Sequence, residues 1–221
     1  MREILDLLFR PILETLLMVA ASTSIAAALG GAAGLALYFI SNDRLSEHAG
    51  KLMIVKKIAD RVINTLRSFP FIILMVLVLP LSRLIVGTSL GTVAAIVPLS
   101  VAASPFVARI VESSLAEIDR GILDAAIASG ASKVRILFAI LVPEAMPSLV
   151  SGLTLTMISL VGYSAMAGVI GGGGLGDLAI RYGYQRFRTD IMIAAVLAII
   201  LLVEGIQMTG NAITRNLKAN R

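Results

Sequence analysis

The sequence predicts an all-α membrane protein with about five transmembrane helices. Hydrophobic residues make up 57% of the 221 residues, charged residues make up only 15%, and the mean hydropathy is +0.93. A soluble globular domain is usually about half apolar and about a quarter charged. The apolar residues also form long runs, because no charged residue occurs in 15–42, 84–108 or 145–176. Each run exceeds the roughly 20 residues with which a helix crosses the hydrocarbon core.

These runs divide the chain into five expected spans within one transmembrane domain, 1–221. The spans are expected at about 13–40, 58–82, 87–111, 138–170 and 191–210, and a polar segment at 112–137 separates the third from the fourth. The first is interpreted as a retained span rather than a cleaved signal peptide, because Glu3 and Asp6 precede it and its apolar run is too long. Its small residues, 26–34, would let another helix approach closely.

Prolines in the second and fourth spans should bend or interrupt them. Only fifteen residues separate Arg67 from Arg83, so the second helix should begin before Arg67. Pro70 should then bend or interrupt this helix, since proline removes a backbone hydrogen bond. The fourth span contains Pro143 and Pro147 and should be broken or kinked for the same reason.

The basic residues predict an orientation for the five spans. With the N-terminus outside, the cytoplasmic side holds thirteen of the 19 lysines and arginines, including all five lysines. Cytoplasmic loops are usually enriched in these residues. We therefore expect a multi-pass protein of the bacterial inner membrane, with the N-terminus outside, the C-terminus in the cytoplasm and the lipid bilayer around it.

Several classes of chemistry are excluded by residues that the chain lacks. It has no cysteine and only one histidine, His48, so we expect no disulfide framework and no multi-histidine metal site. A serine protease is excluded, because Ser164 could pair only with His48, which lies in a loop rather than on a facing span. The four glycines at 171–174 lack the lysine of a phosphate loop and are expected to form a flexible turn. We expect no catalytic residue, metal site or cofactor in this chain and no nucleic-acid partner.

The polar segment 112–137 carries the most specific pattern in the sequence. Asp124 opens a helical stretch of small residues, and Gly130 would let the chain turn sharply. A second short helix is expected from Lys133 to Leu137, before the chain re-enters the membrane near Pro143. An exposed helix pair with small residues at its corner suits insertion into a partner's groove. An ordinary solvated amphipathic helix is the alternative interpretation.

This segment resembles the EAA loop of ABC-importer permeases, in which E-A-A, three residues, G and nine residues precede I-x-L-P. Asp124 and Val142 depart conservatively from that pattern, which usually has glutamate and leucine there. The resemblance implies a type I ABC-importer permease fold with a cytoplasmic coupling-helix loop. The implied ATPase-coupling residues are Asp124, Ala125, Ala126, Gly130, Ala131, Val134, Ile140 and Pro143.

The resemblance extends over nearly the whole chain and is strongest to methionine-importer permeases. Matching stretches include 67–74, 85–91, 95–99, 160–166 and 173–176. It implies a second copy of this chain, two separate ATPase subunits that hold ATP and Mg²⁺, and an extracytoplasmic substrate-binding protein. The chain itself would be a non-enzymatic permease for methionine, L- and D-isomers included. Another amino acid, glycine betaine or, in a different class, a secondary transporter remain alternatives.

Two further groups of residues are candidates for contacts with substrate or partners. Tyr163 and Met166 are one helical turn apart and offer an apolar, polarizable surface suited to a thioether, although packing against lipid or protein is an equal alternative. The substrate-pathway candidates are Tyr163, Met166, Ser68 and Pro70. The candidates for binding-protein contact, or alternatively for lipid headgroups, are Arg181, Arg186 and Arg188. Glu204 lies inside the fifth span and is interpreted as part of a buried ion pair or as lying near the inner interface.

Overall fold

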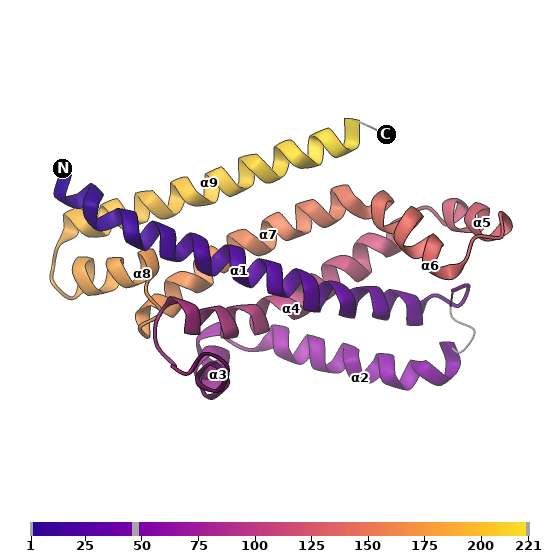
Figure 1. Ribbon diagram of the computed structural model, residues 1–221, viewed down its shortest axis with the longest axis horizontal. Helices are drawn as coiled ribbons and strands as arrows, with labels where there is room; N and C mark the ends of the chain where they lie inside the picture. Colours follow the sequence, from indigo (N-terminus) through magenta and orange to yellow (C-terminus); the bar gives the residue numbers. More distant parts are fainter. Residues whose placement is uncertain (1, 46–48, 220–221) are drawn as a thin grey trace.

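The computed structural model describes residues 2–45 and 49–219, in which all regular structure is helical (Figure 1). The elements are α1 (Arg2–Ser41), α2 (Ala49–Ser68), α3 (Phe71–Val86), α4 (Thr92–Ala116), α5 (Arg120–Ala128), α6 (Lys133–Arg135), η1 (Ile136–Leu141), α7 (Val142–Val169), α8 (Gly174–Leu178), η2 (Ala179–Tyr184) and α9 (Thr189–Ala219). The two elements labelled η are π-helical. The predicted all-α class is confirmed.

Four long helical stretches run along the length of the molecule. The stretches Asp6–Ser41, Thr92–Ala116, Lys133–Val169 and Thr189–Ala219 are each long and apolar enough to cross a membrane. The bent pair α2–α3 raises the number to five if it counts as one span, in agreement with the prediction. The chain begins at the α8 end of the molecule and finishes at the end that holds α5 (Figure 1). The start of α1 and the finish of α9 therefore lie toward opposite ends, as five crossings would place them.

The interval 58–82, expected as one span, is not a single helix. Arg67 lies in the last turn of α2, so the helix does begin before it, as predicted. The axis then turns by 110° between Ser68 and Phe71. Pro70 stands directly before α3 with an extended ψ of 126° and cannot donate a helical hydrogen bond. The predicted interruption at Pro70 is thus a sharp corner, and α3 leaves the direction of the other helices (Figure 1).

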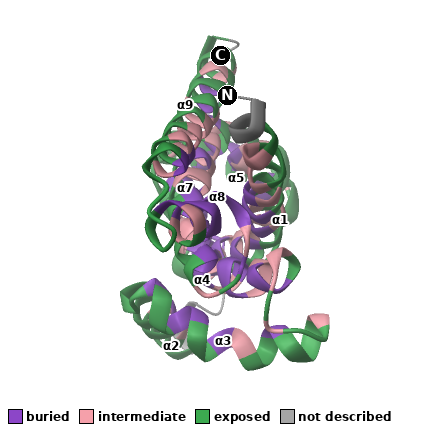
Figure 2. Ribbon diagram, turned by 90° about the vertical axis from the view of Figure 1, so that its left-hand side faces the viewer, coloured by how far each residue is buried: buried purple, intermediate pink, exposed green. Residues whose placement is uncertain are grey.

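The core of the bundle is the contact between α1 and α4. An added Cβ atom at Gly30 or Gly34 would overlap the backbone carbonyl oxygens of Ser104 and Ala108. The small residues of 26–34 therefore allow the close approach that the sequence predicts. Figure 2 shows buried residues concentrated on α4, whereas α2 and α3 lie on one side of it and α9 on the other, with largely exposed surfaces.

The fourth span differs from the expected short helix followed by a broken one. Residues 133–169 form one continuous helical stretch, α6–η1–α7. Its irregularity is the π-helical turn Ile136–Leu141, which ends just before Pro143, a residue without the N–H that continues a regular helical ladder. Pro147 is accommodated inside α7. The separate helix expected from Lys133 to Leu137 is therefore wrong, because its residues run directly into the span.

The buried helix α8, which continues into the partly exposed η2, follows the glycine turn and was not predicted. Gly171, Gly173 and Gly174 have φ values of 89°, 78° and 80°, in the left-handed region that glycine adopts readily. All five residues of α8 are buried. Its first N–H groups donate to α1, from Gly174 to the Glu14 carboxylate at 2.8 Å and from Leu175 to the Thr15 hydroxyl at 3.0 Å.

Candidate functional site

The candidate site is the corner between α4 and α7, residues 117–135, which we call the α5 corner. The Asp119 carboxylate accepts a hydrogen bond of 2.6 Å from the Gly121 N–H and so caps the start of α5. Since α5 begins at Arg120, Asp124 lies in its second turn rather than its first. The helix ends before Gly130, whose φ of 74° permits the sharp turn that the sequence predicts.

The α5 corner presents small, apolar and charged side chains that its own chain leaves exposed. Leu123 and Ala126 are the two buried residues of the nine in α5 and attach it to the bundle. Asp124 and Ala125 are exposed, and the Val134 side chain is 68% exposed. Of the other predicted coupling residues, Gly130 and Pro143 are exposed and Ala131 and Ile140 are partly buried.

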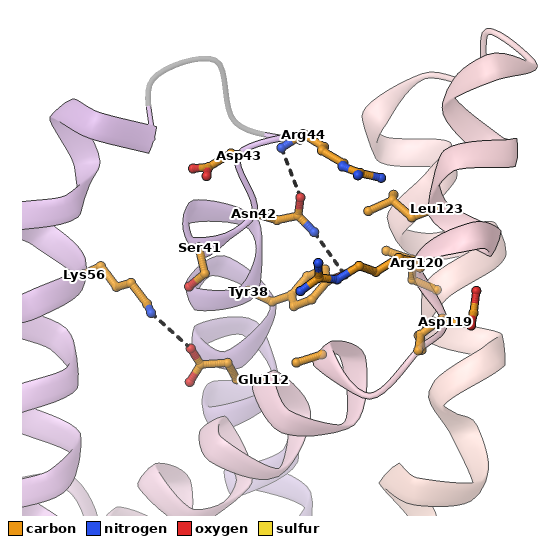
Figure 3. A pocket seen from close by; sticks show the side chains of 13 residues that line it. Tyr38, Ser41, Asn42, Asp43, Arg44, Lys56, Glu112, Asp119, Arg120 and Leu123 are labelled. Carbon is orange, nitrogen blue, oxygen red and sulfur yellow. Dashed lines mark hydrogen bonds and ion pairs between the residues drawn. The ribbon is translucent and has the colours of Figure 1, made fainter.

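Charged and polar side chains connect this corner to the end of α1. Arg44, just beyond α1, forms an ion pair with Asp124 of α5. The Arg44 backbone N–H donates to the Asn42 side-chain oxygen at 3.1 Å, and the Asn42 amide donates to the Tyr38 hydroxyl at 3.3 Å. These side chains, with Lys56 and others, surround a polar cavity of about 400 Å³ between α1, α4 and α5 (Figure 3).

An ion-pair cluster beside this cavity ties α2 to α4. The Arg109 guanidinium lies 2.8 Å from an Asp60 carboxylate oxygen, and the Lys56 ammonium lies 3.7 Å from Glu112. The Asn64 side-chain oxygen accepts from Arg109 at 3.3 Å. The spacing of Lys56 and Asp60, one helical turn apart, indicates a charged face on α2, but the pairing with α4 depends on the packing of distant segments.

Two of the four substrate-pathway candidates lie where α3 meets α7. The Tyr163 ring stacks on Phe71, with ring centroids 4.4 Å apart and planes 10° apart. Pro70 precedes Phe71, so two of the candidates lie in one place. Met166 is 45% exposed one turn beyond Tyr163. The Ser68 hydroxyl donates to the Asn64 carbonyl oxygen at 2.8 Å within its own helix.

The three arginines expected to contact a binding protein each have a partner within the chain. Arg181 pairs with Asp177, which raises the pKa of the Arg181 guanidinium. Arg188 lies 2.7 Å from Asp190, and Arg186 lies 4.5 Å above the Tyr182 ring. All three arginines stand at the α8 end of the molecule, opposite the α5 corner.

Two remaining expectations concern an isolated carboxylate and metal binding. Glu204 is exposed on α9, so the buried position expected for it is not found in this single chain. No group of three or more histidine and carboxylate side chains that could hold a metal ion occurs in the described part of the chain. His48 lies outside the described residues.

Comparison with known proteins gives a consistent family. The family described as "Binding-protein-dependent transport system inner membrane component" matches residues 45–217. The probable D-methionine transport system permease protein MetI of Vibrio cholerae is 44% identical over 95% of this chain and 92% of its own length. The methionine import system permease protein MetP of Bacillus subtilis is 44% identical over 72% of this chain and 72% of its own.

Solved structures agree with these relatives. An inward-facing structure of the MetNI methionine ABC transporter superposes with a TM-score of 0.92 at 40% identity, covering 98% of this chain and 99% of the other. A structure of an amino acid ABC transporter with histidines has a TM-score of 0.71 at 17% identity over 96% of this chain and 93% of the other, which shows a shared fold.

Proposed function

This chain belongs to the family of inner membrane components of binding-protein-dependent transport systems, and from that premise we propose that it is the permease subunit of an ATP-driven methionine importer. The observation that carries the proposal is its full-length similarity to a solved methionine transporter. The relatives described above are named for D-methionine or methionine transport, so L- and D-methionine are the proposed substrates.

The α5 corner is the proposed docking surface for the ATPase. Its exposed residues include small and apolar side chains, such as Ala125 and Val134, beside charged ones, such as Arg120, and such a helix suits a groove in another protein. Leu123 and Ala126 on the opposite face attach it to the bundle, and Arg44 links it to the end of α1. A displacement of α5 would therefore be transmitted to the long helices instead of being absorbed in a free loop.

The proposed assembly contains two copies of this chain, two ATPase subunits and an extracytoplasmic binding protein. ATP and Mg²⁺ would be held by the ATPases, since the sequence has no phosphate-loop motif. The exposed surfaces of α2, α3 and α9 leave room for the second copy and for lipid (Figure 2). In this arrangement the α5 end faces the cytoplasm, and the α8 end, with Arg181, Arg186 and Arg188, faces the binding protein.

The mechanism that this arrangement supports is alternating access. Closure of the ATPases on ATP would move the two α5 corners and rock the membrane halves between inward-open and outward-open states. Methionine released from the binding protein would pass along the axis between the copies. Ser68, Pro70, Tyr163 and Met166 are the proposed wall of that path near the α3–α7 contact.

Substitutions of two glycines test the docking role of α5, because both substitutions should strain the backbone to a similar degree. Gly130 and Gly87 both have positive φ, 74° and 85°, both are exposed, and neither has an atom within 4 Å of an added Cβ. Gly130→Leu and Gly87→Leu should therefore destabilise the fold equally, by about 1–2 kcal/mol. We expect Gly130→Leu alone to separate ATP hydrolysis from methionine uptake in proteoliposomes containing the whole complex. Uptake at the wild-type rate in Gly130→Leu would contradict the docking role.

The substrate is tested on the binding protein that works with this permease. Competition among L-methionine, D-methionine and glycine betaine for that protein, measured by calorimetry, should rank the two methionine isomers above the betaine. If the binding protein bound glycine betaine more tightly than methionine, the chain would still be assigned as a permease, but methionine would no longer be its proposed substrate.

A further inference from the structure

We propose that Arg67 and the cavities on either side of Phe106 form a substrate-recognition site within the permease, in which Arg67 binds the carboxylate of a zwitterionic amino acid and the cavity between α4 and α7 takes its apolar side chain. This inference rests on the proposed amino-acid import and adds to it a residue-level site.

Arg67 is a cation without a carboxylate partner among the described residues. Its guanidinium lies 4.9 Å from the centroid of the Phe106 ring, and this cation–π contact is the interaction that the structure gives it. Phe106 lies well inside α4, a helix apolar and long enough to cross a membrane. Arg67 is exposed in this single chain, so an anionic ligand can reach its guanidinium, and a cation held beside an apolar span is a functional candidate.

The neighbouring ion pairs do not supply the missing negative charge. Lys56, Asp60, Arg109 and Glu112 form a cluster of two cations and two anions, which is formally neutral. Arg67 therefore carries the uncompensated positive charge of this region. A planar guanidinium presents two parallel donors that match a carboxylate, so the anionic group of an amino acid is a suitable partner.

Two cavities meet at Phe106 and Ile110, and they differ in chemistry. The first, of about 480 Å³, is lined by Arg67, Arg109, Glu112 and Ser113 in addition to the shared residues. The second, of about 210 Å³, lies between α4 and α7 and is mostly apolar. Its other lining residues are Ala103, Leu155, Thr156, Ser159, Leu160 and Tyr163.

This division fits an α-amino acid with a neutral, flexible side chain. The charged head would lie in the first cavity, with its carboxylate on Arg67. The side chain would pass Phe106 into the second cavity, where aromatic rings of Phe106 and Tyr163 offer favourable contacts to a thioether sulfur. A cationic or anionic side chain would find no countercharge there.

Uptake kinetics test the role of Arg67. In proteoliposomes with the ATPase and the binding protein, Arg67→Gln should lower the maximal rate of L-methionine uptake about tenfold or more, as expected for a lost charge-assisted hydrogen bond. The half-saturating concentration of loaded binding protein should not change. Arg67→Lys should recover part of the rate. Arg61→Gln, an exposed arginine on the same helix that lines neither cavity, is the control and should resemble the wild type.

Because the chain has no cysteine, a single introduced thiol tests occupancy directly. Ser159 lines the apolar cavity, whereas Ser24 lies on α1, and each is an exposed serine whose hydroxyl donates to the carbonyl four residues earlier. Saturating L-methionine should slow labelling of Ser159→Cys by roughly threefold or more. L-methionine should not change the labelling rate of Ser24→Cys. It should also not change that of Ser159→Cys when Arg67→Gln is present.

The outcomes separate this site from the proposed function. Wild-type uptake of methionine together with unchanged kinetics in Arg67→Gln would overturn the site alone. Loss of the permease dimer in Arg67→Gln, seen by size-exclusion chromatography, would assign Arg67 to the contact between copies and also overturn it. A wild-type complex that takes up no methionine would remove the proposed function, and this inference with it.

Discussion

The short helices α5 and α8 stand at opposite ends of the bundle and are built in opposite ways (Figure 1). In α8 all five residues are buried, and α1 accepts its first N–H groups. In α5 two of nine residues are buried, and its outer face carries exposed small and apolar side chains. The difference indicates that α8 is completed by its own chain, whereas the exposed face of α5 is the surface that we propose another subunit covers. Substitutions at the two helices should accordingly affect different measurements.

The largest expected effect is that of Gly176→Val in α8. An added Cβ at Gly176 would overlap the backbone of Ala165 in α7, which cannot rotate away as a side chain could. We expect a loss of about 3 kcal/mol or more in stability, measured as a lower thermal midpoint in detergent. Ala125→Val in α5 is the control, because Ala125 is exposed. Equal midpoints for the two variants would contradict the difference between the helices.

Thr15→Val should have the next largest effect, although Thr15 lies on α1. Its hydroxyl accepts the Leu175 N–H of α8, and the residue is 1% exposed. Valine has the same shape but leaves that buried N–H without an acceptor, which costs about 1–3 kcal/mol. The thermal midpoint should fall by less than in Gly176→Val. An unchanged midpoint would show that α1 does not stabilise α8 through this bond.

Asp119→Ala removes the N-terminal cap of α5 and should have a smaller effect. The Asp119 carboxylate accepts from the Gly121 N–H at an exposed helix start, where loss of a cap costs about 1 kcal/mol. The thermal midpoint of the whole chain should hardly change, while hydrogen exchange at the start of α5 should accelerate. Exchange that remains slow would mean that packing, and not the cap, orders this helix.

The smallest effect on stability is expected for Arg44→Gln. Its ion pair with Asp124 joins two side chains that are each about half exposed, 48% and 52%. Such pairs contribute at most about 1 kcal/mol. We expect an unchanged thermal midpoint but weaker coupling of ATP hydrolysis to uptake, since α5 loses its link to α1. A substantial fall in the midpoint would place Arg44 in the stable core instead.

The sequence predicts the parts of this fold that depend on composition and local geometry. Uncharged runs indicate the spans, Pro70 predicts the break before α3, and the glycines Gly30 and Gly34 predict close packing of α1. Each of these features depends on residues that are close together in the chain, so it can be predicted from the sequence alone.

The parts that the sequence does not predict depend on contacts between distant segments. The four glycines at 171–174 suggest a loop, yet they are followed by the buried α8, because its small residues fit against α1 and α7 only in the folded bundle. The pairing of Arg109 in α4 with Asp60 in α2 is likewise fixed by packing. At the α5 corner, the motif predicts the turn at Gly130, but the pairing of Asp124 with Arg44 requires the end of α1 to be nearby.

The glycine contact between α1 and α4 gives the permease a fixed reference distance for measurements of its motion. Because Gly30 and Gly34 bring the backbones of α1 and α4 together without intervening side chains, the distance between these helices should stay constant through the transport cycle. In a chain without cysteine, two introduced thiols can carry a pair of fluorescent dyes. A pair on α1 and α4 of one copy would report dye behaviour alone, and one dye on each of the two copies would report the proposed rocking of the membrane halves.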